Sequence, residues 1–276
     1  MTAVHHLNCG TMCPRGARLL AGSGGWLAEA RLVAHCLLVE NGDSLVLVDT
    51  GFGTGDAADP SRLGQPFRAL VRPRCDESET ALRVIERMGL DPGDVRDIVL
   101  THLDLDHAGG LGDFPDANVH VFGPELTAAL HPSLRERARY VPAQWAHGPQ
   151  WSTHQVGGDD WFGFESVRLL EGGAADVALV PLPGHTAGHA GVAIRTGDGW
   201  LLHCGDAFFH RDEVAAAPSC PPGLRAFQAL NAHDREKRGR NLDRLRALAR
   251  EHGGEVELLC SHDPVMLDRD RAAGGS

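Results

Sequence analysis

Residues 101–110, THLDLDHAGG, place two histidines and two aspartates next to each other in the chain. The preceding residues 95–100, VRDIVL, have the apolar pattern of a buried strand. Charged side chains beside such a strand are costly to desolvate unless an ion pairs with them. The stretch therefore predicts a metal site at the end of a buried strand.

The spacing inside this stretch predicts how its side chains are divided. In an extended chain, His102, Asp104 and Asp106 would point to one side and the intervening leucines to the other. His107 follows at once, so a turn could direct it to a second ion beside the first. The glycines at 109 and 110 would allow the backbone to bend tightly near the site.

Three further segments share this position at the end of a predicted strand, where a rigid scaffold can present ligands to a common point. They are PGHTAGH at 183–189, HCGDAFF at 203–209 and CSHDP at 260–264. A single His-x-Asp pair is more often a surface or capping feature, since most exposed polar residues have no special task. The four segments together favour a metal centre.

Strands and helices alternate along the chain. Strand-like runs at 31–40 and 45–51 are joined at Asn41-Gly42, which favours a hairpin turn. Helical patterns occupy 79–90, 123–140 and 223–253, and a short tail at 269–276 is expected to fray. The order predicts an α/β protein with two face-to-face sheets and helices outside, in one domain over residues 1–276.

Residues 141–165 differ in composition from the rest of the chain. Trp145, Trp151 and Trp161 lie here among Gly, Pro, His and Gln, which predicts an irregular, aromatic-rich insertion. Because ligand pockets are commonly aromatic, the insertion could line a pocket for an acyl group. It could equally cover a sheet, and the sequence favours neither role.

Composition narrows the class of protein. The 42% hydrophobic and 23% charged residues are ordinary for a globular enzyme. The net charge of -11 argues against nucleic acid as a partner, because that binding depends on Lys and Arg. No apolar run is long enough to span a membrane, and no secretory signal is evident. The 7 scattered cysteines are expected to be reduced thiols in a cytoplasmic protein. The oligomeric state cannot be predicted.

The ordered segments, from LVLVDTG at 45–51 to CSHDP at 260–264, resemble the metallo-β-lactamase superfamily over nearly the whole chain. The resemblance implies an αββα sandwich of two mixed β-sheets flanked by helices, with two divalent metal ions at one edge. The resemblance implies one set of ligands for a first metal, another set for a second metal, and one aspartate that bridges the two metals. These are His102, Asp104 and His185 for the first, Asp106, His107 and His262 for the second, and Asp206 as the bridge.

Asp104 departs from the family pattern, which usually has His at this position. With Asp106 and Asp206 it gives the centre three carboxylates, so two divalent ions would keep one formal positive charge in place of two. Hard oxygen ligands shift metal preference from zinc toward iron or manganese. We therefore expect two ions, zinc or else iron or manganese at the Asp104 set. A mononuclear site that has lost the Asp104 metal is the alternative.

Other candidate ligands carry weaker signals. Asp49 resembles the family's acid that orients a ligand without binding metal. His189 could support a ligand or only pack. His5, His6 and His35 are interpreted as core or surface residues. His203 and His210 flank the Asp206 segment, where His210 could face the substrate, although the sequence favours this less. Cys9 and Cys13 have no second close pair to complete a structural zinc site.

The implied activity is hydrolysis of an ester or lactone of a small molecule by a metal-bound hydroxide, without a covalent intermediate. Asp106 is the candidate catalytic residue, because a ligand carboxylate could also orient the nucleophile or pass a proton to the leaving group. Phe209 stands where similar lactonases commonly place Tyr, and Tyr140 is the only tyrosine. A hydroxyacylglutathione-type thioesterase and a non-catalytic metal-binding or sensing domain are the alternatives.

Overall fold

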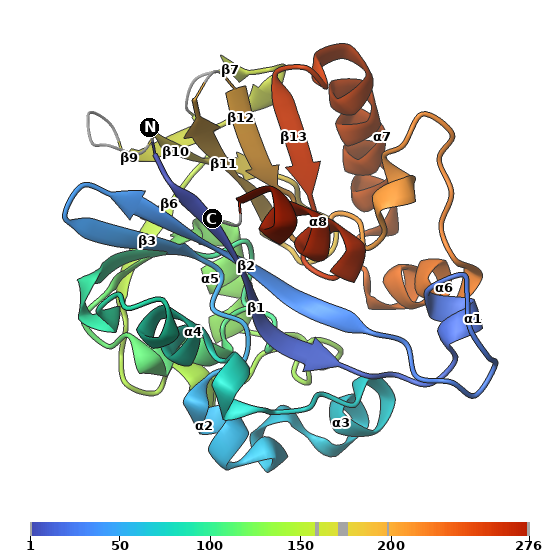
Figure 1. Cartoon of the computed structure of the whole chain (residues 1–276), viewed down its shortest axis with the longest axis horizontal. Helices are drawn as coiled ribbons and strands as arrows, with labels where there is room; N and C mark the ends of the chain where they lie inside the picture. Colours follow the sequence, from blue (N-terminus) through green and yellow to red (C-terminus); the bar gives the residue numbers. More distant parts are fainter. Residues whose placement is uncertain (1, 158–159, 171–175, 198, 275–276) are drawn as a thin grey trace.

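The computed structural model describes residues 2–157, 160–170, 176–197 and 199–274, in two large sheets that face each other (Figure 1). The first sheet has the strand order β1-β2-β3-β4-β5-β6. Its strands are β1 (Val4–Met12), β2 (Leu32–Asn41), β3 (Ser44–Val48), β4 (Val95–Val99), β5 (Asn118–Phe122) and β6 (Gln150–His154). β1, β2 and β3 pair antiparallel, whereas β3 to β6 pair parallel, so the sheet is mixed.

The second sheet has the order β13-β12-β11-β10-β9 and is also mixed. Its strands are β13 (Val256–Leu259), β12 (Gly199–His203), β11 (Ala190–Thr196), β10 (Val177–Pro181) and β9 (Val167–Leu170). Only β12 and β13 pair parallel. A small two-stranded sheet, β7 (Asp160–Trp161) with β8 (Phe164–Glu165), lies beside it.

Helices cover the outer sides of the sheets and the ends of the sandwich (Figure 1). They are α1 (Ala17–Leu20), α2 (Thr54–Ala58), α3 (Gln65–Val71), α4 (Ala81–Arg87), α5 (Gly123–Leu130), α6 (Pro222–Asn231), α7 (Arg235–His252) and α8 (Pro264–Gly274). α7 packs against β13, and α8 packs against β1 and β2. Within the described residues, no helix is long and apolar enough to cross a membrane.

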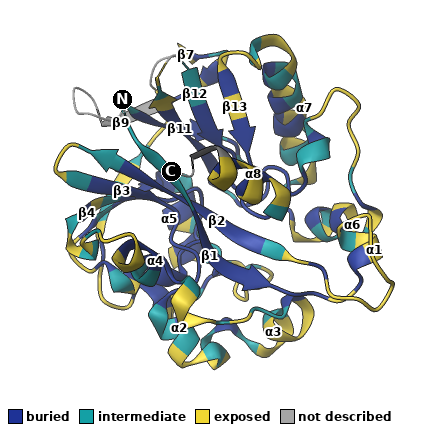
Figure 2. Cartoon of the chain, viewed as in Figure 1, coloured by how far each residue is buried: buried dark blue, intermediate teal, exposed yellow. Residues whose placement is uncertain are grey.

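The alternation of apolar residues in the strands explains the layers. On β3, Val46 and Val48 face the second sheet and join its core, which includes Val192 of β11. Leu45 and Leu47 of the same strand face the other way, into a core that includes residues of α4. Figure 2 shows the sheets as buried and the outer turns of the helices as exposed. The predicted αββα arrangement of two mixed sheets is confirmed.

Two of the predicted helices are shorter than the sequence pattern indicated. The pattern at 123–140 forms a helix only as far as Leu130, because the residue before Pro132 is sterically disfavoured in a helix. The pattern at 223–253 breaks between α6 and α7, where Asp234 caps the N-terminus of α7. The backbone N–H groups of His233 and Asp234 donate to the segment that carries His185. The break therefore ties the helices to one of the ligand loops.

The predictions for the hairpin, the insertion and the tail had different outcomes. The hairpin after Asn41 is confirmed. The irregular insertion at 141–165 was only partly right, because residues 150–154 form the edge strand β6 by pairing in parallel with β5. The prediction that 269–276 frays was wrong up to Gly274, since this part continues α8. Residues 275–276 lie outside the described part.

Candidate metal centre

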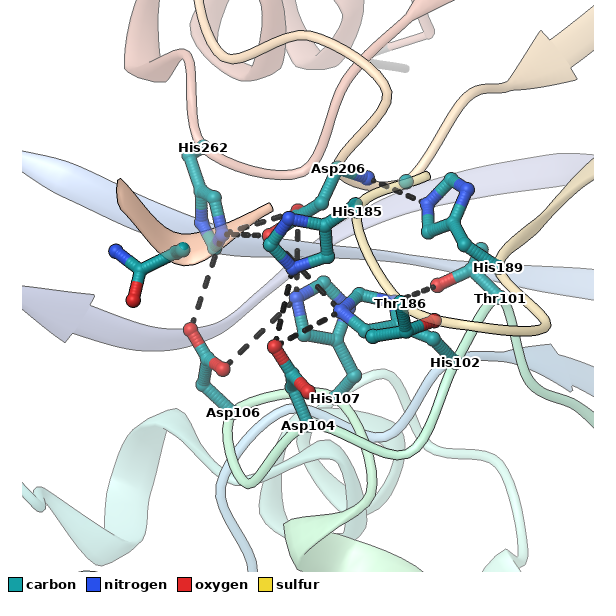
Figure 3. Close-up of polar contacts among 12 residues, drawn as sticks. Thr101, His102, Asp104, Asp106, His107, His185, Thr186, His189, Asp206 and His262 are labelled. Atoms are coloured by element: carbon teal, nitrogen blue, oxygen red, sulfur yellow. Dashed lines mark hydrogen bonds and ion pairs between the residues drawn. The ribbon is translucent and has the colours of Figure 1, made fainter. Parts of the chain in front are cut away.

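The four predicted segments meet at one edge of the two sheets, and all seven predicted ligand side chains converge there (Figure 3). Two groups of potential ligands each have one ligand atom per residue within 4.8 Å of the others. They are His102, Asp104 and His185 in the first set, and Asp106, His107 and His262 in the second. These are the two sets that the family resemblance implied.

The stretch that carries four of these side chains is not fully extended, as the alternation had suggested. β4 ends at Val99, and the backbone N–H of His107 donates to the Asp104 carbonyl at 2.9 Å, which closes a turn. This turn directs His107 to the second set. The backbones of Gly109 and Gly110 are not in the left-handed conformation. A Cβ on Gly109 would lie only 2.6 Å from the carbonyl oxygen of Gly51, so close packing requires glycine at that position.

Asp206 lies between the two sets and contacts histidines of both; Nε2 of His262 is close to both of its oxygens, with Oδ2 at 3.2 Å. Its Oδ2 is 3.3 Å from Nε2 of His185 and 3.9 Å from Nε2 of His102. Its Oδ1 is 3.1 Å from Nε2 of His262 and 3.4 Å from Nε2 of His107. Ligands placed tetrahedrally about 2.0–2.1 Å from a zinc ion are about 3.3 Å apart, so these separations suit a bridging carboxylate.

Several polar atoms at this point are buried and have no hydrogen-bond partner in the described part of the chain. They include Nε2 of His102, Nε2 of His107 and Oδ1 of Asp206. A buried polar atom left without a partner is costly, and a metal ion would satisfy imidazole nitrogens and carboxylate oxygens together. The donor set therefore fits two divalent cations.

Hydrogen bonds on the far side of three imidazoles turn their Nε2 atoms toward the centre. Nδ1 of His107 donates to Oδ2 of Asp49 at 2.9 Å, and Nδ1 of His262 donates to the carbonyl of Val33 at 2.8 Å. Nδ1 of His102 donates to the Thr101 hydroxyl, which in turn donates to Asp49. Asp49 therefore orients two potential ligands, which is the role its resemblance implied.

We expect Asp49→Asn to weaken metal binding about 10- to 100-fold, the usual effect of removing a partner of a ligating histidine. Asn tolerates the left-handed backbone of this residue (φ 54°), but its amide has one acceptor oxygen where Asp49 uses two, Oδ2 for His107 and the Thr101 hydroxyl and Oδ1 for the Thr101 backbone N–H. Titration of metal-free protein with zinc measures the change. Asp43→Asn on the exposed hairpin is the control, and equal affinities of the two variants would contradict this role.

His189 and His203 hold the backbone around Asp206. Nε2 of His189 accepts from the Asp206 backbone N–H at 2.9 Å, while its Nδ1 donates to the Leu182 carbonyl. Nδ1 of His203 accepts from the N–H of Gly205 at 3.2 Å. His189 therefore positions a ligand, whereas its side chain lies outside the two ligand sets.

Sequence reasoning missed Glu125, whose carboxylate joins two ligand loops. Its Oε1 accepts from the Leu103 N–H at 3.0 Å and from the Tyr140 hydroxyl at 3.2 Å. Its Oε2 accepts from the Thr186 hydroxyl at 2.6 Å and from the Gly188 N–H at 3.0 Å. A Cβ on Gly188 would lie 2.1 Å from the Glu125 backbone, so glycine permits this close approach. The one available signal in the sequence was an acidic residue inside the largely apolar stretch GPELTAAL, which forms α5.

Arg139 was also missed, although it bears directly on Asp104. Its Nε lies 3.4 Å from Oδ1 of Asp104, and its guanidinium donates to the His185 carbonyl at 2.9 Å. Burial raises the pKa of Asp104, but Arg139 and His102 outweigh it and hold that pKa well below its usual range. Asp104 is therefore an anion whose charge Arg139 offsets.

A cavity of about 700 Å³ opens onto both ligand sets. Phe67, Phe209 and Phe227 form part of its apolar lining. Four arginines also line it, Arg62, Arg135, Arg137 and Arg139. The three tryptophans of the 141–165 segment do not line it; Trp145 and Trp161 belong to the hydrophobic cores, so they cover sheets.

The fold and the site define a metallo-hydrolase scaffold, and comparison with known proteins gives the family. A model of the metallo-beta-lactamase superfamily matches residues 30–251. The chain belongs to this superfamily.

Individual relatives differ in how closely they match. A probable metallo-hydrolase from Mycobacterium tuberculosis is 47% identical over 272 residues, which cover 98% of this chain and 83% of that protein. An N-acyl homoserine lactonase from Azorhizobium caulinodans is 27% identical over 253 residues, covering 90% and 88%. The structure of an N-acyl homoserine lactone hydrolase with a product at its catalytic metal centre has a TM-score of 0.72 and 21% identity, covering 96% and 95%. This last likeness concerns the fold.

Proposed function

We propose that the protein is a dinuclear metal-dependent hydrolase that cleaves an ester or lactone bond of a small molecule. The observation that carries this proposal is the pair of ligand sets on either side of the Asp206 carboxylate at the wall of an open cavity. Homoserine lactone hydrolases among its relatives support the choice of a lactone. The carboxylate of Asp104 favours iron or manganese in the first set, with zinc as the alternative.

When bound, two divalent ions would lower the pKa of a bound water molecule and polarise the substrate carbonyl. The protein holds the groups around that water. Asp106 lines the cavity with its two oxygens 3.9 Å from His107 and 3.8 Å from His262, where it can orient water. We assign to it the transfer of a proton from the attacking water to the alkoxide that leaves when the C–O bond breaks.

The cavity suggests what kind of molecule binds. Its phenylalanines suit an apolar chain, and Phe209, whose ring centroid is 5.9 Å from that of His185 and 4.7 Å from that of His262, lies directly over the centre. Phe209 offers no hydroxyl to a substrate. Tyr140 lines the same cavity, but its hydroxyl donates to Glu125. We therefore propose a small, largely apolar ester or lactone held by contacts other than a tyrosine hydrogen bond.

The test is a panel of aryl esters, lactones with and without an acyl-amide group, and thioesters, run with zinc, iron and manganese in parallel. We expect turnover on an oxygen ester or lactone, loss of that turnover with a chelator, and recovery on adding metal back. Bound metal without turnover on any member would favour the non-catalytic sensing domain instead.

The number of ions in the centre is measured by comparing the metal content of the wild type with that of a variant that lacks ligands of both sets. A variant with both His102→Ala and His107→Ala loses one ligand from each set. We expect it to bind two fewer metal equivalents than the wild type, with circular dichroism confirming that it is folded. A difference of one equivalent would favour a mononuclear centre.

A thioesterase acting on a substrate with carboxylates is the second candidate function. The arginines of the cavity favour it, because guanidinium groups pair well with carboxylates. Arg135 donates to backbone carbonyls, and Arg62 lies 3.6 Å from Asp56. Arg137 has no ion pair with any described residue, so its guanidinium is the one best placed to pair with a substrate carboxylate. Faster turnover of thioesters with anionic thiols than of esters in the panel would favour this activity.

A further inference from the structure

A second group of potential ligands lies apart from the seven residues of the metal centre. It consists of His6 on β1, His35 on β2 and Asp270 on α8, with one ligand atom from each within 4.8 Å of the others. Nδ1 of His6 is 2.9 Å from Nε2 of His35 and 3.9 Å from Oδ2 of Asp270. The group therefore joins the C-terminal helix to the first sheet, where α8 crosses β1 and β2 in Figure 1.

The strand register explains why the two histidines meet. On the antiparallel pair of β1 and β2, His6 pairs with Leu37, and His35 lies two residues before Leu37. Because side chains alternate along a strand, His6, His35 and Leu37 lie on the same face of the sheet. Leu37 belongs to the core between the sheets, so this is the inner face, and α8 closes its end.

Two polar atoms of this group are buried without a hydrogen-bond partner in the described residues. They are Oδ2 of Asp270, whose residue is 7% exposed, and Nδ1 of His35, whose residue is 1% exposed; of the two, Oδ2 is the candidate ligand atom, since His35 faces His6 with its Nε2. Oδ2 of Asp270 is directed at His6 but is too distant for a hydrogen bond. A buried carboxylate oxygen in this position calls for a cation.

The neighbouring arginines do not fill this need. Arg269 binds the other oxygen of Asp270 at 2.6 Å and also Glu257 at 2.6 Å. Arg271 donates to the backbone carbonyl of His6 at 2.8 Å. Oδ2 of Asp270 is therefore left facing the two imidazoles.

Both imidazoles are in the form that a metal binds. Burial lowers the pKa of His6 to about 4 against the opposing effect of Asp270, and His203 and the two arginines lower it further. Burial, together with His203 and His6, lowers the pKa of His35 well below its usual value. At neutral pH both rings are therefore uncharged, and a neutral imidazole is the ligand form of histidine.

We propose that His6, His35 and Asp270 bind a divalent transition-metal ion of the zinc class, separate from the proposed catalytic centre. Two imidazoles and one carboxylate are a usual zinc donor set, and three protein ligands leave a fourth position for water. The ligand separations of 2.9 and 3.9 Å bracket the roughly 3.3 Å expected around tetrahedral zinc. His6 is partly exposed, which gives the ion access from solvent.

The ion would act on the fold by pinning α8 across β1 and β2. His35 also connects this region to the ligand loops, because its carbonyl accepts from Nε2 of His203 at 2.7 Å. Two residues earlier on β2, the carbonyl of Val33 accepts from His262. Zinc at this group would therefore stabilise the strand that supports one of the potential catalytic ligands.

The experiment uses the full-length variant His102→Ala/His107→Ala, so that zinc at the catalytic centre does not mask the second site. We expect this protein to bind one zinc equivalent, and its Tm to rise by about 5–10 °C at a zinc concentration roughly 100 times Kd. Adding Asp270→Asn, which keeps the shape of the side chain, should weaken that binding at least about 100-fold and remove the Tm shift.

His5→Ala in the same background is the matched control, because His5 lies next to His6 but bonds Glu40 outside the group. Zinc binding by this control should remain unchanged. The proposal is overturned if the background protein binds no zinc, or if Asp270→Asn and His35→Ala bind zinc as tightly as the control. Neither result depends on turnover, so failure here is distinct from failure of the proposed hydrolase.

Discussion

Asp206→Ala is expected to lower kcat/KM by at least about 10³-fold on whichever substrate the panel identifies. Its carboxylate contacts histidines of both ligand sets, so the substitution removes the one group that both sets share. Metal ions contribute several kcal/mol to stabilising a hydrolytic transition state, and each 1.36 kcal/mol corresponds to a factor of ten. Steady-state kinetics with added metal gives the loss, and metal analysis shows whether the ions remain.

Asp212→Ala is the control for this substitution. Its side chain is half-exposed, lies near His210 and belongs to neither ligand set. We expect its activity to match the wild type within about twofold, whereas Asp206→Ala should be nearly inactive yet folded by circular dichroism. Retained turnover in folded Asp206→Ala would remove the basis for the dinuclear mechanism.

The candidate centre could be predicted because each part of it is local in sequence. Every ligand lies in the loop that follows β4, β10, β12 or β13, and the ends of these strands meet at one edge of the two sheets. The alternation of His102 and Asp104, the turn to His107 and the position of Asp206 after β12 are all visible in short segments. The fold class followed from the same strands, whose apolar runs match the observed layers.

The supporting residues could not be predicted, because they act across long stretches of chain. Arg139 lies in a segment that the helical pattern absorbed, and Pro132 ends that helix early, which releases Arg139 to reach Asp104. The charge balance explains why aspartate can stand at this position. Three carboxylates against two divalent ions would leave one positive charge, and the Arg139 guanidinium restores the second.

The proposed role of His6 and His35 could not be predicted from the sequence. In isolation each is more simply interpreted as a core or surface histidine, because nothing nearby in the sequence supplies a third ligand. Asp270 is more than two hundred residues away and was expected to lie in a frayed tail. Its place on α8 depends on packing between that helix and β1, which apolar periodicity alone does not specify.

Glu125→Ala is expected to destabilise the protein by about 3–5 kcal/mol, the largest effect on stability that we predict. The carboxylate is fully buried and accepts from four donors, two of them backbone N–H groups of the ligand loops. Each buried donor left without an acceptor costs about 1 kcal/mol, and more when its partner was charged. Urea unfolding followed by circular dichroism measures the change, and Tm should fall by roughly 6–15 °C.

A control and a second readout separate this role from a general effect of losing an acid. Glu86→Ala removes an exposed carboxylate whose one ion pair among the described residues is with Arg83, and should change stability by less than about 0.5 kcal/mol. Because Glu125 ties the loop before Asp104 to the loop after His185, Glu125→Ala should also weaken metal binding, whereas Glu86→Ala should not. If the two variants unfold at the same urea concentration and bind metal equally, the loops must be held in place by their own contacts, and Glu125 would have no part in building the centre.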